Sequence, residues 1–127
     1  MSKHIMVVDD SPTIRSSVAF CLRNAGYEVD EAKDGMEALE RLETLRQEGV
    51  ALALILTDIN MPRMDGITFI GRVKNTPFRF LPILVLSTEG EQAMIEKGKK
   101  VGASGWLIKP FNPEQLLWAI RKLIYTK

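Results

Sequence analysis

Cysteine, histidine and net charge are all scarce in this sequence. The 127 residues include one cysteine, Cys21, and one histidine, and the formal net charge is +1 at neutral pH. A single cysteine excludes an internal disulfide. The small net charge argues against a strongly basic surface, so neither nucleic acid nor an anionic membrane is expected as a bulk electrostatic partner. We therefore expect any specificity to come from a local site.

Long hydrophobic runs are also absent. The apolar run before Asp9 is only the four residues Ile5–Val8, which is too short for the apolar region of a signal peptide. No later segment approaches the roughly 20 apolar residues that a membrane helix needs. We see no repeat, linker or low-complexity tract. We therefore expect a cytoplasmic, monomeric domain that spans residues 1–127 and does not contact a membrane.

The apolar residues that are present follow an alternating pattern. Short runs rich in Ile, Val and Leu alternate with longer segments of helical periodicity, which is typical of βα units around a parallel sheet. Three of the runs are nearly continuous, which favours central strands covered on both faces. The expected strands are Ile5–Val8, Tyr27–Ala32, Leu52–Thr57, Ile83–Ser87 and Gly105–Ile108.

Five helices are expected after these strands. Ser11-Pro12 suits the start of the first helix and Gly26 its end. Asp34 and Glu37 have the spacing of a capping box at the start of the second helix. The second helix is expected to end near residue 49. A third helix is expected over about 66–74, a fourth over about 89–101 and a fifth from 112–113 onward.

One buried stripe is expected on the first helix. Val18, Leu22 and Ala25 recur at helical intervals, so they should face the core. Cys21 shares this spacing, and we interpret it as a buried thiol rather than a reactive or metal-binding one.

Polar side chains follow four of the expected strands. Asp9 and Asp10 follow the first strand, Asp58 follows the third, Ser87 ends the fourth and Lys109 follows the fifth. The carboxyl ends of parallel strands share one edge of a sheet, and ligands of open α/β sheets bind at that edge. The sequence therefore predicts one pocket that contains three carboxylates, a hydroxyl and an ammonium group.

Such a group of acids predicts a bound divalent cation. Crowded carboxylates repel one another unless a cation is supplied. Asp10, Asp58 and a backbone carbonyl form an all-oxygen ligand set without His or Cys, which favours Mg²⁺ over zinc. The alternative for any single aspartate here is a helix N-cap. A cap does not, however, require three acids and Lys109 at neighbouring strand ends.

The motifs around these residues resemble those of the response regulator receiver family. The resemblance is closest to single-domain chemotaxis regulators of the CheY type and covers nearly the whole chain. It implies a flavodoxin-like (βα)5 sandwich of three layers, an α/β fold whose five-stranded parallel sheet has the order 2-1-3-4-5 known for CheY. The matching segments are Asp9-Asp10, Thr57–Pro62, Asp65-Gly66, Ser87–Glu89 and Gly102–Phe111.

The resemblance assigns roles to the clustered residues. Asp58 is then the phosphoacceptor, and Lys109 supplies positive charge beside the transferred phosphoryl group. Mg²⁺ is held by Asp9, Asp10, Asp58 and the main-chain carbonyl of Asn60, with Asp9 acting through a metal-bound water. The resemblance also implies a cis peptide bond before Pro110. The alternative for Lys109 is a solvated surface charge.

A second set of residues is expected to form a switch. Ser87 is interpreted as the hydroxyl that moves toward the phosphoryl group, with a helix-capping serine as the alternative. Trp106 stands where the family usually has Tyr or Phe, and we hypothesise that it turns inward on activation; a half-exposed aromatic on the partner surface is the alternative. Asn60 and Glu89 are expected to gate the access of water.

The resemblance also implies a function and partners. The domain should accept a phosphoryl group from a histidine kinase in a Mg²⁺-dependent reaction, catalysing its own phosphorylation and dephosphorylation without being a conventional enzyme. Its output should be a changed contact with a flagellar motor switch or a phosphotransfer protein, through the face of the fourth helix, fifth strand and fifth helix. Trp118 is expected on or near this face, or else partly buried. A phosphorelay intermediate and a fragment of a larger regulator remain alternatives.

Two other classes of protein are considered. A phosphohydrolase of the haloacid dehalogenase type also uses an aspartyl phosphate, but it carries a DxD motif after the first strand and a cap insertion, whereas this chain has adjacent Asp9-Asp10. A binding module with a decayed site is disfavoured because Asp10, Asp58, Ser87 and Lys109 are all present.

Overall fold

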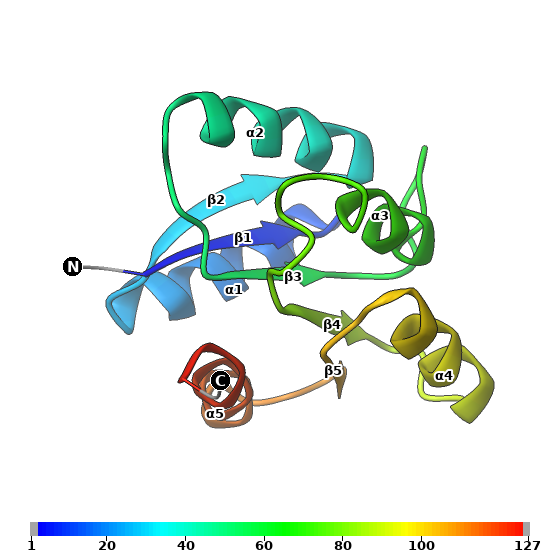
Figure 1. Cartoon of the computed structure of the whole chain (residues 1–127). Helices are drawn as coiled ribbons and strands as arrows, with labels where there is room; N and C mark the ends of the chain where they lie inside the picture. The colour runs from blue at the N-terminus through cyan, green and yellow to red at the C-terminus, as the bar shows by residue number, and fades with distance from the viewer. Residues whose placement is uncertain (1–2, 126–127) are drawn as a thin grey trace.

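Strands and helices alternate along residues 3–125, the part of the chain that the computed structural model describes (Figure 1). The strands are β1 His4–Val8, β2 Glu28–Ala32, β3 Leu54–Thr57, β4 Ile83–Ser87 and β5 Gly105–Ile108. The helices are α1 Pro12–Asn24, α2 Gly35–Gln47, α3 Gly66–Val73, α4 Gln92–Val101 and α5 Pro113–Tyr125. All five predicted βα units are confirmed. Within residues 3–125, no helix combines the length and the hydrophobicity of a membrane span.

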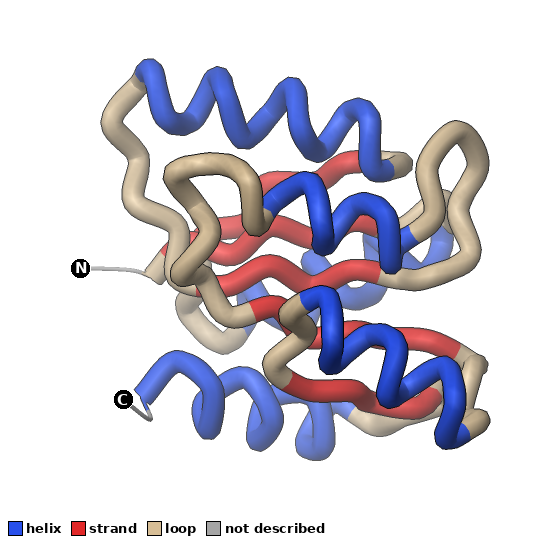
Figure 2. The backbone as a smooth tube through the Cα atoms, turned by 45° about the vertical axis from the view of Figure 1, so that its right-hand side comes forward, coloured by secondary structure: helices blue, strands red, loops and turns tan. Residues whose placement is uncertain are grey.

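The strands form one parallel sheet in the order β2-β1-β3-β4-β5. Helices cover both faces, so the molecule has three layers (Figure 2). The predicted α/β, flavodoxin-like sandwich and its strand order are therefore confirmed. The three inner strands β1, β3 and β4 are the nearly continuous apolar runs, because only strands covered on both faces need apolar side chains on each face.

Two hydrophobic cores lie on opposite faces of the sheet. Since successive side chains of a strand point to opposite faces, Met6 and Val8 pack with α2, α3 and α4, whereas Ile5 and Val7 pack with α1 and α5. Phe69 is fully buried in the first core. The sheet is therefore packed between the two helical layers.

The predicted helix caps are largely confirmed. Ser11 caps α1 by accepting a hydrogen bond from the backbone N–H of Ile14, and Gly26 after the helix has a φ of +96°. Asp34 caps α2 by accepting a hydrogen bond from the N–H of Glu37. The Glu37 carboxylate accepts from the N–H of Lys33 instead of that of Asp34, so the predicted capping box is shifted by one residue.

Some boundaries and burial predictions were wrong. Ala25 is exposed because it is the C-cap of α1, and Ala19 instead joins Val18 and Leu22 in the buried stripe. Cys21 is only partly buried, although burial still raises the pKa of its thiol. That direction agrees with an unreactive thiol.

Two strands and one helix also begin later than predicted. Tyr27 precedes β2, and Leu52 is buried but precedes β3. Helix α4 begins at Gln92, and Glu89 belongs to the loop before it. The single domain predicted over residues 1–127 extends beyond the described residues at both ends, and its boundaries stay a prediction.

Candidate functional site

Three aspartates gather at the carboxyl edge of the sheet. Asp9 and Asp10 follow β1 and Asp58 follows β3, and these strands are neighbours. Each aspartate offers a carboxylate oxygen that lies within 4.8 Å of the others. Asp9 is buried, Asp58 is partly buried and Asp10 is exposed. The predicted convergence of the acids is therefore present, and the cluster opens toward solvent at Asp10.

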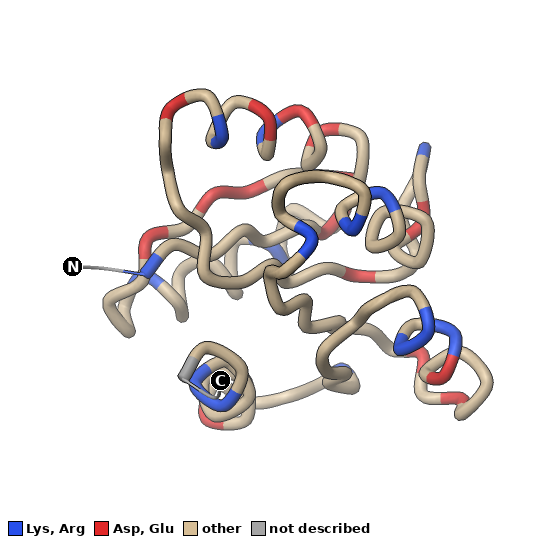
Figure 3. The backbone as a smooth tube through the Cα atoms, in the orientation of Figure 1, with Lys and Arg blue, Asp and Glu red and all other residues tan. Residues whose placement is uncertain are grey.

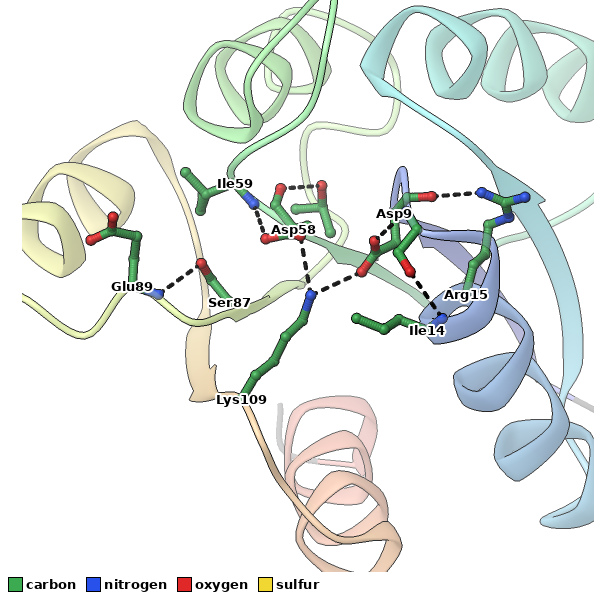
Figure 4. A network of polar contacts seen from close by, with 10 residues as sticks. Asp9, Ile14, Arg15, Asp58, Ile59, Ser87, Glu89 and Lys109 are labelled. Atoms are coloured by element: carbon green, nitrogen blue, oxygen red, sulfur yellow. Dashed lines mark hydrogen bonds and ion pairs between the residues drawn. The ribbon is translucent and has the colours of Figure 1, made fainter.

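Lys109 completes the cluster from the end of β5. Its ammonium group donates hydrogen bonds of 3.1 Å to Asp9 Oδ2 and 3.1 Å to Asp58 Oδ2 (Figure 4). The side chain is 11% exposed, so the alternative of a solvated surface charge is wrong. Burial alone would lower the pKa of Lys109, but the hydrogen bonds and charges of the two aspartates outweigh it and raise the pKa. The predicted cis peptide bond before Pro110 is present.

Backbone groups orient the two carboxylates that Lys109 contacts. Asp58 Oδ1 accepts a 2.7 Å hydrogen bond from the N–H of Ile59, and Asp9 Oδ1 accepts one of 2.9 Å from the N–H of Ser11. Each of these carboxylates thus has one oxygen on a backbone N–H group and the other on the ammonium group. The N-caps of the following helices are Ser11 and Asp65, so the N-cap alternative for the clustered acids is wrong.

The donor set fits a hard divalent cation. Three carboxylates supply oxygen only, and several close negative charges face a single ammonium group. Mg²⁺ prefers such ligands and keeps some of its waters, which the exposed side of Asp10 would accommodate. Asn60 lies exposed in the loop after β3, two residues beyond Asp58. The role of its carbonyl as a ligand stays a prediction.

Ser87 ends β4, and Glu89 lies in the loop between β4 and α4. Ser87 is fully buried at the end of β4, and its hydroxyl accepts a 3.1 Å hydrogen bond from the N–H of Glu89. The alternative of a helix-capping serine is wrong, since α4 begins only at Gln92 and its N-cap is Glu91. The Glu89 side chain points away from Asp58 in Figure 4. Its gating role, like that of Asn60, stays a prediction.

Trp106 is half-buried and joins three elements. It lies on β5, its indole N–H donates a 2.7 Å hydrogen bond to the backbone carbonyl of Glu89, and its ring packs closely on Gly98 of α4. The ring belongs to the core beneath α2, α3 and α4. This arrangement places the indole against the loop between β4 and α4, while its rotation on activation stays a hypothesis.

Trp118 lies on α5 and is 59% exposed, so the alternative of a partly buried residue is wrong. Its ring centroid lies 4.9 Å from the Lys122 ammonium nitrogen. Trp106, Trp118 and Lys122 line a hollow of about 980 Å³ between β5 and α5. Helix α4 adds the lysines Lys97, Lys99 and Lys100, and Figure 3 shows basic residues along this helix in blue. The expected output face therefore offers aromatic and basic side chains together.

Two arginines near the cluster were not predicted from the sequence. Arg15 of α1 donates a 2.7 Å hydrogen bond to the backbone carbonyl of Asp9 and lies 3.4 Å from a Glu31 carboxylate oxygen. Arg63 forms an ion pair with Asp34, which is 29 residues away in the sequence. No local spacing relates such partners, and only the folded chain brings them together.

Comparisons with known proteins agree with this geometry. The sequence model of the response regulator receiver domain matches residues 5–121. The chemotaxis protein CheY1 of Helicobacter pylori is 37% identical over 114 residues, which cover 88% of this chain and 89% of that protein.

Solved structures are similar over almost the whole chain. The chemotaxis protein CheY4 of Vibrio cholerae is 41% identical with a TM-score of 0.89, covering 97% of this chain and 99% of that chain. A complex of CheX, CheY, BeF3 and magnesium from Borrelia burgdorferi is 22% identical with a TM-score of 0.89 and covers 98% of this chain and 90% of that chain. At this identity the Borrelia complex supports the fold alone.

Proposed function

Because this chain belongs to the response regulator receiver family, we propose that it is a phosphorylatable switch of two-component signalling with Asp58 as its phosphoacceptor. One observation carries the proposal: Asp58 is remote in sequence from the adjacent pair Asp9-Asp10, yet all three offer carboxylate oxygens within 4.8 Å of one another. The Lys109 ammonium group bridges two of them. A solvated or capping carboxylate needs none of these neighbours. The family membership also disfavours the alternative of a haloacid dehalogenase-type phosphohydrolase.

The proposed reaction is a transfer of a phosphoryl group from a histidine kinase. A carboxylate oxygen of Asp58 attacks phosphorus, and the P–N bond to the kinase imidazole breaks with its electron pair remaining on nitrogen. Lys109 holds its proton at neutral pH, because the ordinary lysine pKa of 10.5 already lies well above 7 and the adjacent acids raise the pKa of Lys109 further. Its positive charge then stabilises the phosphoryl oxygens as they gain negative charge.

The acids are proposed to hold Mg²⁺ as the cofactor. Asp10 and Asp58 would bind the ion directly, Asp9 through a water, and the Asn60 carbonyl would complete the protein ligands. When bound, Mg²⁺ neutralises charge on the phosphoryl group and orients it. The oxygen-only donor set supports this assignment.

The switch is proposed to pass from Ser87 to the face of α4, β5 and α5. On phosphorylation the Ser87 hydroxyl gives up the hydrogen bond that it accepts from the Glu89 N–H and donates one to a phosphoryl oxygen. The loop before α4 moves with it. Trp106 senses this movement because its indole is hydrogen-bonded to the same loop. Asn60 and Glu89 are proposed to control access of water to the acyl phosphate.

The similarity to CheY proteins supports a role in chemotaxis. We propose a histidine kinase as phosphodonor, a flagellar motor switch or phosphotransfer protein as output partner, and the cytoplasm as location. The domain turns over only its own phosphoryl group and is in that sense not a conventional enzyme. A receiver within a larger regulator would use the same chemistry.

Incubation with acetyl phosphate and Mg²⁺, followed by intact-mass measurement, tests the proposal. The wild type should gain one phosphate-sized adduct that is absent when Mg²⁺ is chelated, and Asp58→Asn should gain none. Asp65→Asn is the matched control, because asparagine retains the cap of α3 and the residue lies outside the cluster. Equal labelling of Asp58→Asn and wild type would show that another residue is the phosphoacceptor.

A further inference from the structure

Arg63 has an unusual backbone conformation in the loop between β3 and α3. Its φ is +66°, and it is the only non-glycine residue with a positive φ among residues 3–125. The N–H of Met64 donates a 2.7 Å hydrogen bond to the carbonyl of Pro62, which closes a three-residue turn around Arg63. Turns of this type with a positive central φ are rare and strained. Other contacts must therefore stabilise the turn.

The Arg63 side chain provides one such contact. Its Nε and Nη2 donate hydrogen bonds of 2.9 Å each to Asp34 Oδ2 and Oδ1. The Asp34 side chain is only 4% exposed, whereas that of Arg63 is 53% exposed. A two-point ion pair fixes both the distance and the angle between its partners. The loop is therefore attached to the first turn of α2, where Asp34 is the N-cap.

Met64 provides a second attachment at the same place. A Cβ atom added to Gly35 would lie 3.0 Å from Met64 Sδ, so the Met64 side chain rests directly on that glycine. Asp34-Gly35 and Arg63-Met64 thus contact each other at two successive residues. This pair of contacts holds the middle of the loop, while the N–H of Gly66 binds the carbonyl of Ile59 at its base with a 2.7 Å hydrogen bond.

The ion pair also borders the acidic cluster. Asp10, Asp34 and Arg63 line one hollow of about 480 Å³, together with Lys33 and Pro62. The loop that Arg63 holds is the one that carries Asn60, three residues before it. The position of the Asn60 carbonyl relative to the acids therefore depends on a loop whose middle is held by α2.

We propose that Arg63 is a positioning residue for the reaction at Asp58. Through Asp34 it holds the loop so that the Asn60 carbonyl faces the metal site. This inference rests on the proposed function. It predicts that loss of the ion pair weakens Mg²⁺ binding, although neither partner is a metal ligand.

The test is calorimetric titration of the metal-free proteins with MgCl2. Arg63→Gln and Asp34→Asn should each weaken Mg²⁺ binding about 10-fold, the effect typical of residues that orient metal ligands. Asparagine still caps α2, which keeps the helix start intact. The double variant should be no weaker than either single one, because both remove the same pair. Arg63→Lys keeps the charge but not the two-point geometry and should be intermediate.

The matched control is Arg46→Gln. Arg46 also forms an ion pair, with Glu43 on α2, but it lies outside the hollow beside Asp10. Its Mg²⁺ affinity should equal that of the wild type. The rate of labelling by acetyl phosphate should fall in Arg63→Gln at low Mg²⁺ and return to within about twofold of wild type at saturating Mg²⁺, since the chemical groups are intact.

Hydrogen exchange separates positioning from general destabilisation. In the metal-free Arg63→Gln protein, the Met64 amide should exchange faster while the amide of Leu56 in β3 keeps its protection. An Mg²⁺ affinity of Arg63→Gln and Asp34→Asn equal to that of wild type would overturn this inference alone. A wild-type protein that binds no Mg²⁺ would overturn the proposed function, and this inference with it.

Discussion

Substitution of Gly98 by alanine measures how tightly Trp106 packs against α4. Alanine in the middle of a helix is normally about 1 kcal/mol more favourable than glycine. A Cβ atom at position 98 would, however, lie 2.7 Å from Cζ3 and 3.3 Å from Cε3 of the Trp106 ring. Such overpacking costs about 1–3 kcal/mol. The two effects together predict that Gly98→Ala lowers the free energy of unfolding by about 1 kcal/mol.

The chain offers a matched control for this substitution. Gly71 lies within α3, and an added Cβ would have no atom within 4 Å. Gly71→Ala should therefore raise the free energy of unfolding by about 0.5–1 kcal/mol through helix propensity alone. Urea unfolding followed by circular dichroism measures both variants under the same conditions.

The same substitution in a Trp106→Phe protein isolates the contact between the ring and residue 98. In Trp106→Phe the smaller ring leaves room beside residue 98, so the same Gly98→Ala change should become stabilising by about 0.5–1 kcal/mol. The double-mutant cycle should then give a coupling energy of about 2 kcal/mol. If Gly98→Ala, with Trp106 in place, stabilises the protein as much as Gly71→Ala does, the indole does not pack on α4 as described. Its proposed role in sensing movement of the loop between β4 and α4 then loses its basis.

Three further predictions concern the acidic cluster and the contacts that hold the loop between β3 and α3. Gly66→Ala should lower the free energy of unfolding by at least about 3 kcal/mol, because the added Cβ would lie 2.2 Å from the Asp58 carbonyl oxygen. A decrease of less than about 1 kcal/mol, measured by urea unfolding, would contradict this contact. Lys109→Met leaves two acids without their cation, so Mg²⁺ should raise its melting temperature more than that of wild type; an equal rise would argue against a shared electrostatic site. The Arg63 hydrogen bonds lower the pKa of Asp34 below its ordinary value of 3.8. Since a depressed carboxyl pKa stabilises the fold above the unfolded-state pKa, the stability difference between wild type and Arg63→Gln should be constant from about pH 7 to 5 and shrink toward pH 3. A difference that persists undiminished at the lower pH would refute the ion pair's contribution.

The fold could be predicted from local patterns because the determining forces are local. Alternation of short apolar runs and amphipathic segments reports which faces are buried, and caps such as Ser11 and Asp34 act within a few residues. Boundaries were less accurate where tertiary contacts outweigh local preference. Glu89 stays in a loop because its N–H binds Ser87 and its carbonyl binds Trp106.

The acidic cluster could be anticipated for a topological reason. Once strands are parallel, their carboxyl ends meet at one edge, so Asp9, Asp10, Asp58 and Lys109 converge whatever the details of packing. The contacts of Lys109 with Asp9 and Asp58 were accessible only in the folded structure, because β4 separates β5 from the strands that carry the acids.

What the sequence by itself determined is thus the class of fold, the edge at which chemistry occurs and the residue types gathered there. Only the tertiary structure decided how these groups are held: the ion pair of Arg63 with Asp34, and the fit of Trp106 on Gly98. The physical reason is that periodicity and capping act between near neighbours along the chain. Ion pairs and steric contacts depend instead on separations of a few ångströms between residues that the sequence places far apart.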